Sequence, residues 1–211
     1  MRVALIGGGW IAESIAQGIV EHGSELVGVC DRDSARRETW AGRQVPTFAD
    51  HHGLLAECGA DVVFVLTPTE SHAGITLDAL AAGCHVIVEK PIASSVGEAR
   101  TMVAAGESAG KHVLVEESYL FMPSHLAAFD LVDAGTIGEL RSITHTFYGW
   151  LPHEHRAARV ALANSTGWRG DGDYPWMRDH LVHLFALSRR FAGGGPPVDV
   201  RCFGGPGEAS V

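Results

Sequence analysis

The stretch VALIGGGWIA, residues 3–12, decides the fold of this chain. An apolar run ends in three glycines, and apolar residues then recur at helical spacing as far as Val20. This order of strand, glycine turn and helix matches the fingerprint G-x-G-x-x-[GA] of a dinucleotide-binding turn. In such a turn Gly7 makes the tight bend, Gly9 lets the backbone approach a pyrophosphate, and Ala12 lets helix and strand pack closely. The alternative is an ordinary glycine-rich connection without a ligand.

Asp31 favours the dinucleotide interpretation over the plain turn. It follows the second apolar run, Leu26–Cys30, at a place where a carboxylate can hold the hydroxyl groups of an adenosine ribose. Because a carboxylate there repels a 2′-phosphate, the sequence predicts NAD as the cofactor. Three nearby arginines reduce this preference and keep NADP as an alternative: Arg32, Arg36 and Arg37.

Short strands and helices alternate over residues 1–118. The predicted strands cover Arg2–Ile6, Leu26–Cys30, Asp61–Leu66, Val86–Val88 and Val113–Val115, and the predicted helices cover Ile11–Val20, Ser34–Ala41, Leu54–Cys58, His72–Ala82 and Val96–Ala109. Such alternation is typical of a parallel sheet with helices on both faces. We therefore predict an α/β class protein whose first domain is a doubly wound Rossmann sheet.

The pattern changes beyond residue 118, so we place a second domain at 119–211. Helices are predicted at Pro123–Ala134 and Asp179–Phe191, and strands at Leu140–Trp150 and Val198–Phe203. These elements predict a shortened α+β domain with a mainly antiparallel sheet. Because so short a sheet leaves an open edge and an apolar face, we expect a homo-oligomer formed through this domain.

The composition narrows the class of partner and the compartment. With 16 Lys and Arg, 25 Asp and Glu and no basic run, the net charge of −9 argues against nucleic acid and membrane surfaces. No apolar run approaches the roughly 20 residues of a membrane helix, and the N-terminus has no signal-peptide pattern. Four scattered cysteines without a C-x-x-C pair are typical of reduced thiols. We expect a cytoplasmic protein with a small-molecule substrate.

Four further segments carry recognisable patterns. They are T-P-x-x-x-H at 67–72, A-L-x-A-G-x-H-V…E-K-P at 79–91, P…G-x-I-G-E-L at 123–140 and W-R…D-x-x-x-H at 168–183. Together with the N-terminal fingerprint, they resemble the Gfo/Idh/MocA oxidoreductase family from residue 1 to about residue 191. The chain resembles a short or truncated member, since the second domain of the family normally continues through further strands.

The resemblance implies an enzyme, an NAD(P)-dependent dehydrogenase. It would transfer a hydride between nicotinamide and a hydroxyl or keto group of a sugar, a cyclitol or a related small molecule. Family members line the substrate site with residues that correspond to Lys90, Asp179 and His183. The residues expected at the cofactor are Gly7, Gly9, Trp10, Ile11, Ala12, Asp31, Arg32, Thr67, Pro68, His72, Glu89 and Lys90.

The chemistry of these side chains is compatible with the implied roles. Lys90 follows a strand at the edge where open α/β sheets bind ligands, and Pro91 keeps it extended. Asp179 and His183 share one helix face. We expect His183 to take the proton of the substrate hydroxyl, Lys90 to stabilise the same oxygen, and Asp179 to orient the site. A solvated lysine and a solvated polar pair on a helix are the structural alternatives.

Some positions depart from the family pattern. Leu181 and Ala186 replace a glycine and an aspartate of the family's helix, and residues 174–177 read Tyr-Pro-Trp-Met where glycines are usual. These bulky groups leave two other functions open. One is a non-catalytic NAD-binding sensor or partner subunit, and the other is an NAD-dependent glycosidase.

Other polar residues have less definite interpretations. Tyr119 and His125 stand near the domain junction, where Tyr119 is expected to be a packing aromatic. Glu116-Glu117 is expected to be a solvated or strand-end pair of charges. Because neither His153-x-His155 nor His180-x-x-His183 completes a familiar ligand set, no metal site is predicted.

Overall fold

A computed structural model describes residues 1–146 and 175–199, and gives side chains for 1–146 and 181–199. The chain divides into two compact units, Met1–Glu116 and Glu117–Val211. None of the described helices is both long enough and apolar enough to span a membrane.

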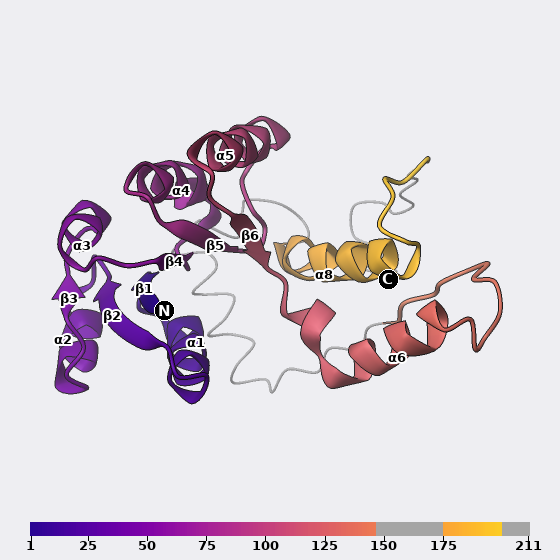
Figure 1. The fold of residues 1–211 in the computed structure, drawn as a ribbon, viewed down its shortest axis with the longest axis horizontal. Helices are drawn as coiled ribbons and strands as arrows, with labels where there is room; N and C mark the ends of the chain where they lie inside the picture. Colours follow the sequence, from indigo (N-terminus) through magenta and orange to yellow (C-terminus); the bar gives the residue numbers. More distant parts are fainter. Residues whose placement is uncertain (147–174, 200–211) are drawn as a thin grey trace. The chain divides into compact units, whose positions relative to one another are not determined.

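A six-stranded sheet forms the centre of the first unit (Figure 1). Its strands are β1 (Arg2–Ile6), β2 (Glu25–Cys30), β3 (Thr47–Phe48), β4 (Val62–Val65), β5 (His85–Glu89) and β6 (Val113–Glu116). All neighbours are parallel, in the order β3-β2-β1-β4-β5-β6. The order changes direction between β1 and β4, where open sheets of this kind bind ligands. Ile6 is in register with both Cys30 and Val65, so the three central strands end together.

Helices cover both faces of this sheet (Figure 1). On one face lie α1 (Trp10–Glu21) and α2 (Ser34–Gly42), and on the other lie α3 (His51–Glu57), α4 (His72–Ala81) and α5 (Val96–Ala109). The side chains of β1 alternate between the two resulting cores. Val3 and Leu5 belong to the core under α1, whereas Ala4 and Ile6 belong to the core under α3–α5. Because both faces are covered, the strands are continuous apolar runs.

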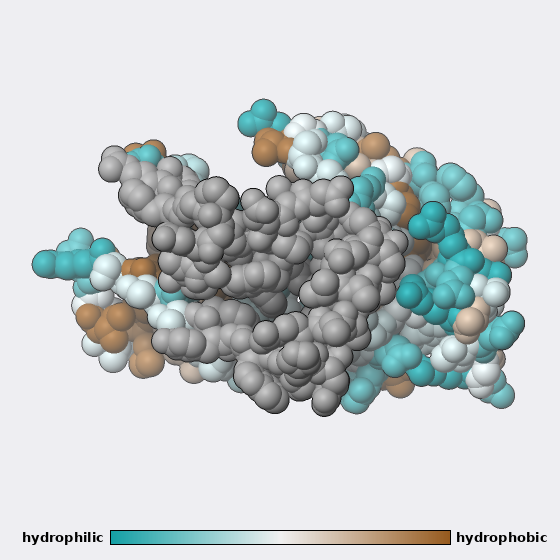
Figure 2. All heavy atoms as spheres, turned by 180° about the vertical axis from the view of Figure 1, so that it is seen from behind, coloured by the Kyte–Doolittle hydropathy of each residue, from teal (hydrophilic) through white to brown (hydrophobic). Residues whose placement is uncertain are grey.

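The first unit has a mainly polar surface and an apolar interior. Seen from behind, the part that carries α2 and α3 is mostly hydrophilic (Figure 2). The central strands, by contrast, bury Leu5, Val63 and Val86 completely, at 0% exposure. This contrast places the main hydrophobic stabilisation of the unit in the layers on either side of the sheet.

The Rossmann sheet predicted from the sequence is confirmed, with one strand added. The missing strand is Thr47–Phe48, which is only two residues long and has no periodicity to detect. Backbone hydrogen bonds define it: Val29 N–H donates to the Pro46 carbonyl and Asp31 N–H to the Phe48 carbonyl. The helical fragment predicted at Leu54–Cys58 begins earlier, because Asp50 caps α3 through the Gly53 N–H.

In the second unit the structure describes η2 (Ser118–Phe121), α6 (Pro123–Asp133) and α8 (Pro175–Phe191). Phe129 and Phe191 pack edge to face, with ring centroids 4.7 Å apart, and Arg190 pairs with Asp133 at 2.5 Å. The sequence predicts strands at Leu140–Trp150 and Val198–Phe203. Their described parts, 140–146 and 198–199, contain no strand, and the remainder lies outside the described residues.

Candidate functional site

Gly7 begins the turn between β1 and α1. Its φ angle is +105°, a value that residues with a side chain rarely adopt. A Cβ atom there would lie 2.7 Å from the backbone oxygen of Leu66. The Gly7 N–H donates to the Cys30 carbonyl at 2.8 Å, which ties the turn to the end of β2. Conformation and space therefore both require glycine at this position.

Gly8 holds the loop against two side chains. Its N–H donates to Asp31 Oδ2 at 2.8 Å, and its carbonyl accepts from Trp40 Nε1 at 3.0 Å. Trp40 is 2% exposed, so the loop rests on a buried indole ring. The sequence interpretation gave Trp40 no role, because nothing in a short helix indicates a partner that lies so far back in the chain.

Gly9 lies open at the N-terminus of α1. Its backbone is extended, with φ −75° and ψ −169°, and it provides no side-chain cap. The atom nearest to a Cβ placed on it is Arg36 Nη1, at 3.9 Å. An anionic group can therefore reach the first N–H groups of the helix and its positive dipole end. This cradle fits the pyrophosphate of a dinucleotide.

Asp31 is a nearly buried carboxylate beside the loop, with 9% exposure. Its Oδ2 accepts from Gly8 N–H and, at 3.3 Å, from Arg36, and its Oδ1 accepts from Asp33 N–H at 2.9 Å. Burial by itself would raise the pKa of Asp31. The Asp33 and Gly8 N–H donors and the Arg36 guanidinium together outweigh burial and hold the pKa below its ordinary value. Asp31 is thus a fixed anion with acceptor capacity for hydroxyl groups.

The arginines near Asp31 have different partners. Arg36 is 54% exposed and lies 3.3 Å from Asp31 and 3.8 Å from Asp33. Arg37 donates to the backbone carbonyls of Asp31 and Arg32, at 2.8 and 2.9 Å. Arg32 is exposed. Of the three arginines, Arg36 is therefore the one whose guanidinium contacts the Asp31 carboxylate in the structure.

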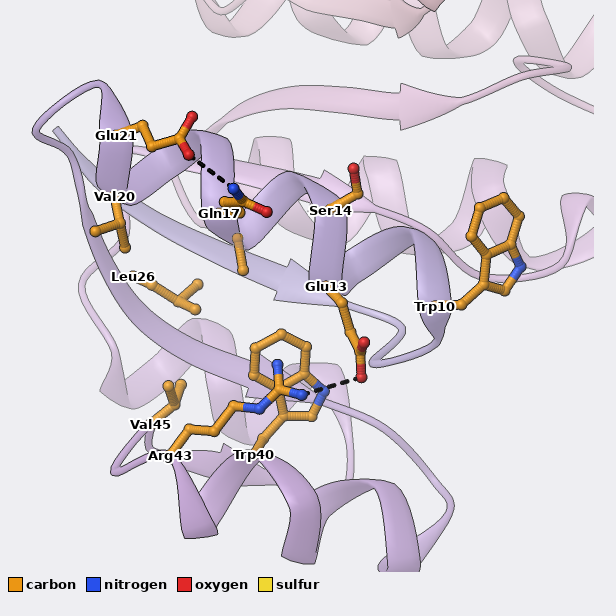
Figure 3. Close-up of a pocket in the computed structure, with 11 residues that line it drawn as sticks. Trp10, Glu13, Ser14, Gln17, Val20, Glu21, Leu26, Trp40, Arg43 and Val45 are labelled. Atoms are coloured by element: carbon orange, nitrogen blue, oxygen red, sulfur yellow. Dashed lines mark hydrogen bonds and ion pairs between the residues drawn. The ribbon is translucent and has the colours of Figure 1, made fainter.

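The remaining fingerprint residues lie on α1. Ala12 is 1% exposed and belongs to the core that includes Leu5 and Val29, where a larger side chain would separate the helix from the sheet. Ile11 is half-buried. Trp10 is 76% exposed and points away from the other labelled side chains of α1 (Figure 3).

A groove of about 840 Å³ follows α1, and of the fingerprint residues Trp10 lines it (Figure 3). It is lined by Trp40 and crossed by an ion pair between Glu13 and Arg43, 3.2 Å apart. The Arg43 guanidinium lies over the Trp40 ring, 4.9 Å from its centroid. Neither Gly9 nor Asp31 lines this groove.

The loops after β4 and β5 carry the next expected residues. His72 is 1% exposed, and its ring nitrogens lie 2.7 Å from the Thr67 carbonyl and 3.0 Å from the Pro91 carbonyl. The ring therefore joins the two loops. Pro68 is the N-cap residue of η1 (Thr69–Ser71), the turn that leads from β4 into α4.

Glu89 and Lys90 stand at the carboxyl end of β5. Glu89 is 9% exposed and in register with Glu116 of β6. Lys90 is half-buried, and its peptide bond to Pro91 is cis. Lys90 is thus at the carboxyl edge of the same sheet that carries the glycine loop.

The second unit brings together a histidine, a carboxylate and an aromatic ring. The side chains of His183 on α8 and of Glu117 before η2 are each 7% exposed, and His183 Nδ1 lies 2.5 Å from Glu117 Oε1. Tyr119 N–H also donates to Glu117, at 3.3 Å. The rings of Tyr119 and His183 stack, with centroids 4.1 Å and planes 7° apart. The orientation of the His183 ring is therefore set through one nitrogen and one face.

Of the two expectations for Glu116-Glu117, the strand-end position is confirmed, because β6 ends at Glu116. A solvated Glu117 is wrong, since that residue is 5% exposed and bonded to His183. Burial of a carboxylate requires such a partner. Tyr119 packs, as expected, but its packing partner is the histidine itself. The side chain of Asp179 lies outside the described residues, as do residue 174, the side chains of 175–177 and those of the histidines at 153, 155 and 180.

This chain is similar to known proteins in both sequence and structure. A family model described as the Gfo/Idh/MocA oxidoreductase family, with an NAD-binding Rossmann fold, matches residues 1–117. A protein from Akkermansia muciniphila named "Glycosyl hydrolase family 109 protein 1" is 31% identical over 184 residues, which are 80% of this chain and 37% of that protein.

Two solved structures share the fold. Myo-inositol 2-dehydrogenase from Lactobacillus plantarum has a TM-score of 0.77 and 26% identity, covering 92% of this chain and 56% of that one. The WlbA dehydrogenase from Bordetella pertussis, solved with NADH and UDP-GlcNAcA, has a TM-score of 0.74 and 26% identity, covering 88% of this chain and 57% of that one. This chain thus spans little more than half the length of these two structures.

Proposed function

Because the chain belongs to the Gfo/Idh/MocA oxidoreductase family, we propose that it takes part in NAD-dependent hydride transfer to or from a hydroxyl or keto carbon. The substrate would be a sugar, a cyclitol or a related small molecule. The observation that carries the proposal is the loop from Gly7 to Gly9. It combines an open helix N-terminus with a fixed carboxylate, the two features that a dinucleotide requires.

The first unit would hold the coenzyme. The N-terminus of α1 at Gly9, Trp10 and Ile11 would bind the pyrophosphate, and Asp31 would accept from the ribose hydroxyls. When bound, the nicotinamide supplies the hydride acceptor or donor. We assign His72 a positioning role, because its ring is buried between the Thr67 and Pro91 carbonyls. The same Asp31 carboxylate supports a preference for NAD over NADP, with Arg36 as the cation that allows some NADP binding.

The second unit would move the proton. His183 would accept the proton of the substrate hydroxyl, since an imidazole can take up and release protons near neutral pH. Glu117 at Nδ1 would fix the tautomer and stabilise the imidazolium, as a buried carboxylate does for a catalytic histidine. Lys90 would donate to the substrate oxygen, and Asp179 would orient the site.

A screen of polyols and sugars with NAD, followed at 340 nm, tests the proposal. Turnover in the wild type, reduced roughly 10²–10⁴-fold in both His183→Ala and Lys90→Ala, is the expected result. If NADH binds but neither these compounds nor aryl glycosides turn over, the result favours a sensor or a partner subunit. If kcat is retained in both variants, the catalytic assignment is wrong.

A second candidate is an NAD-dependent glycosidase, supported by the likeness to the glycosyl hydrolase family 109 protein over 80% of this chain. Release of an aryl group from aryl glycosides, dependent on added NAD and without net absorbance change at 340 nm, would favour it over the dehydrogenase.

We infer a dinucleotide domain at 1–118 and a substrate domain at 119–211, the latter with an antiparallel sheet. Exposed Leu131 and Ile137, which line an apolar groove of about 270 Å³, support association of two copies through that domain. A monomer in light scattering at micromolar concentration would exclude this association.

The buried thiols of the described cysteines support a reducing, cytoplasmic compartment.

A further inference from the structure

Three potential metal ligands meet on the first unit, on the face of the sheet opposite α1. His51 and His52 begin α3, and Asp78 lies on α4. His51 Nε2 is 2.9 Å and His52 Nδ1 is 4.0 Å from the same oxygen, Asp78 Oδ2. All three ligand atoms lie within 4.8 Å of one another.

The fold holds these side chains in place. Asp50 caps α3 through the Gly53 N–H at 2.9 Å, which fixes the turn from which both histidines project. Leu54 of α3 and Ala79 of α4, each 0% exposed, belong to one core, so the two helices are packed against a common layer. The ligand atoms are thus brought together by the packing of the helices.

The distances suit a bound ion. Zn²⁺ binds imidazole nitrogen and carboxylate oxygen at about 2.0–2.2 Å, so tetrahedral ligand atoms lie roughly 3.4 Å apart. The two distances to Asp78 Oδ2 fall on either side of that value. The side chain of His52 is 71% exposed and can move the remaining distance, while His51, at 22%, is held.

We propose that His51, His52 and Asp78 form a binding site for a borderline divalent cation, with Zn²⁺ as its representative. Two imidazoles and one carboxylate suit Zn²⁺, Ni²⁺ or Cu²⁺, whereas Mg²⁺ and Ca²⁺ prefer oxygen ligands alone. Three protein ligands leave the fourth position to water. The ion would join α3 to α4 and would be independent of the proposed oxidoreductase function.

Calorimetric titration of the chelator-treated 211-residue chain with ZnCl₂ tests this site. His52→Ala and Asp78→Asn should each abolish one binding site or weaken it at least 10–100-fold, the range seen for loss of a supporting group. His22→Ala is the matched control, because it removes an exposed histidine of the same unit at the end of α1. It should leave that binding site unchanged.

Two further readouts distinguish the possible outcomes. Zn²⁺ should raise the Tm of the wild type and of His22→Ala, but by less in His52→Ala. NADH affinity should be the same in all four proteins, which shows that the variants are folded. If stoichiometry and affinity for Zn²⁺ are equal in wild type and Asp78→Asn, the cluster is only a contact between His51 and Asp78 without a bound metal, and the proposal is wrong.

Discussion

Adding one methyl group to Gly9 should separate coenzyme binding from folding. In the free protein the new Cβ of Gly9→Ala has 3.9 Å to its nearest neighbour, which is an ordinary contact. The backbone there is extended, so alanine adopts it without strain. The cost is that of a poorer N-cap residue, and we expect the free energy of unfolding to change by less than about 1 kcal/mol.

The same methyl group would stand where the phosphates must approach the backbone. We expect the Kd for NADH to rise at least about 10-fold, which corresponds to about 1.4 kcal/mol. Gly7→Ala, by contrast, should mainly lower the free energy of unfolding. Its positive φ costs about 1–2 kcal/mol with a side chain, and the 2.7 Å contact with Leu66 forces a shift that costs a further 1–3 kcal/mol or so.

Urea unfolding and NADH fluorescence titration on the same preparations measure both effects. Gly18→Ala is the matched control, because it adds a methyl group to α1 at a position with no atom within 4 Å. It should be as stable as the wild type or more so, with an unchanged Kd. A folded Gly9→Ala variant that binds NADH as tightly as the wild type would refute the assignment of the loop as the phosphate site.

Three further predictions concern single side chains. Glu117→Gln should lower kcat by about 10-fold or more in the dehydrogenase assay, because it removes the charge at His183 Nδ1, whereas Tyr119→Phe keeps the stacked ring and should leave kcat unchanged. Asp31→Asn should weaken NADH more than NADPH in binding titrations. The free energy of unfolding of Asp31→Asn should also fall less in acid than that of the wild type. The pKa of Asp31 lies below its ordinary 3.8, so the stability that its carboxylate contributes is present above pH 3.8 and is lost as the pH falls through the lowered pKa. Burial and the neighbouring Asp31 carboxylate raise the pKa of Cys30 from 9.0 to about 11, so the stability contributed by its neutral thiol is complete below pH 9 and falls as the pH rises toward 11. In denaturant titrations Cys30→Ala should lose less stability than the wild type over that interval, and an equal loss would contradict this account.

Most of the first unit could be predicted because its signals are local. The helix predicted at Val96–Ala109 has those bounds in the structure, since Ser95 caps it and Gly110 ends it with a φ of +64°. Thr47–Phe48 could not be predicted in the same way. Two residues carry no period, and they form a strand only because β2 offers them backbone partners.

The residues of the candidate site also differ in whether local sequence signals can predict their contacts. Gly7, Gly9 and Asp31 could be found because the spacing within one βαβ unit dictates where they meet. Glu117 and His183 are 66 positions apart, and although a D-x-x-x-H pattern singles out His183, nothing in its segment indicates Glu117 as its partner. Their pairing follows from the packing of η2 against α8, which no short pattern encodes. For the same reason, sequence spacing indicates His153-x-His155 as possible metal ligands but does not indicate His51 and Asp78, which become neighbours because α3 and α4 share one core. Sequence spacing is therefore a good guide to sites built on one turn, whereas sites assembled from two helices require the packed structure.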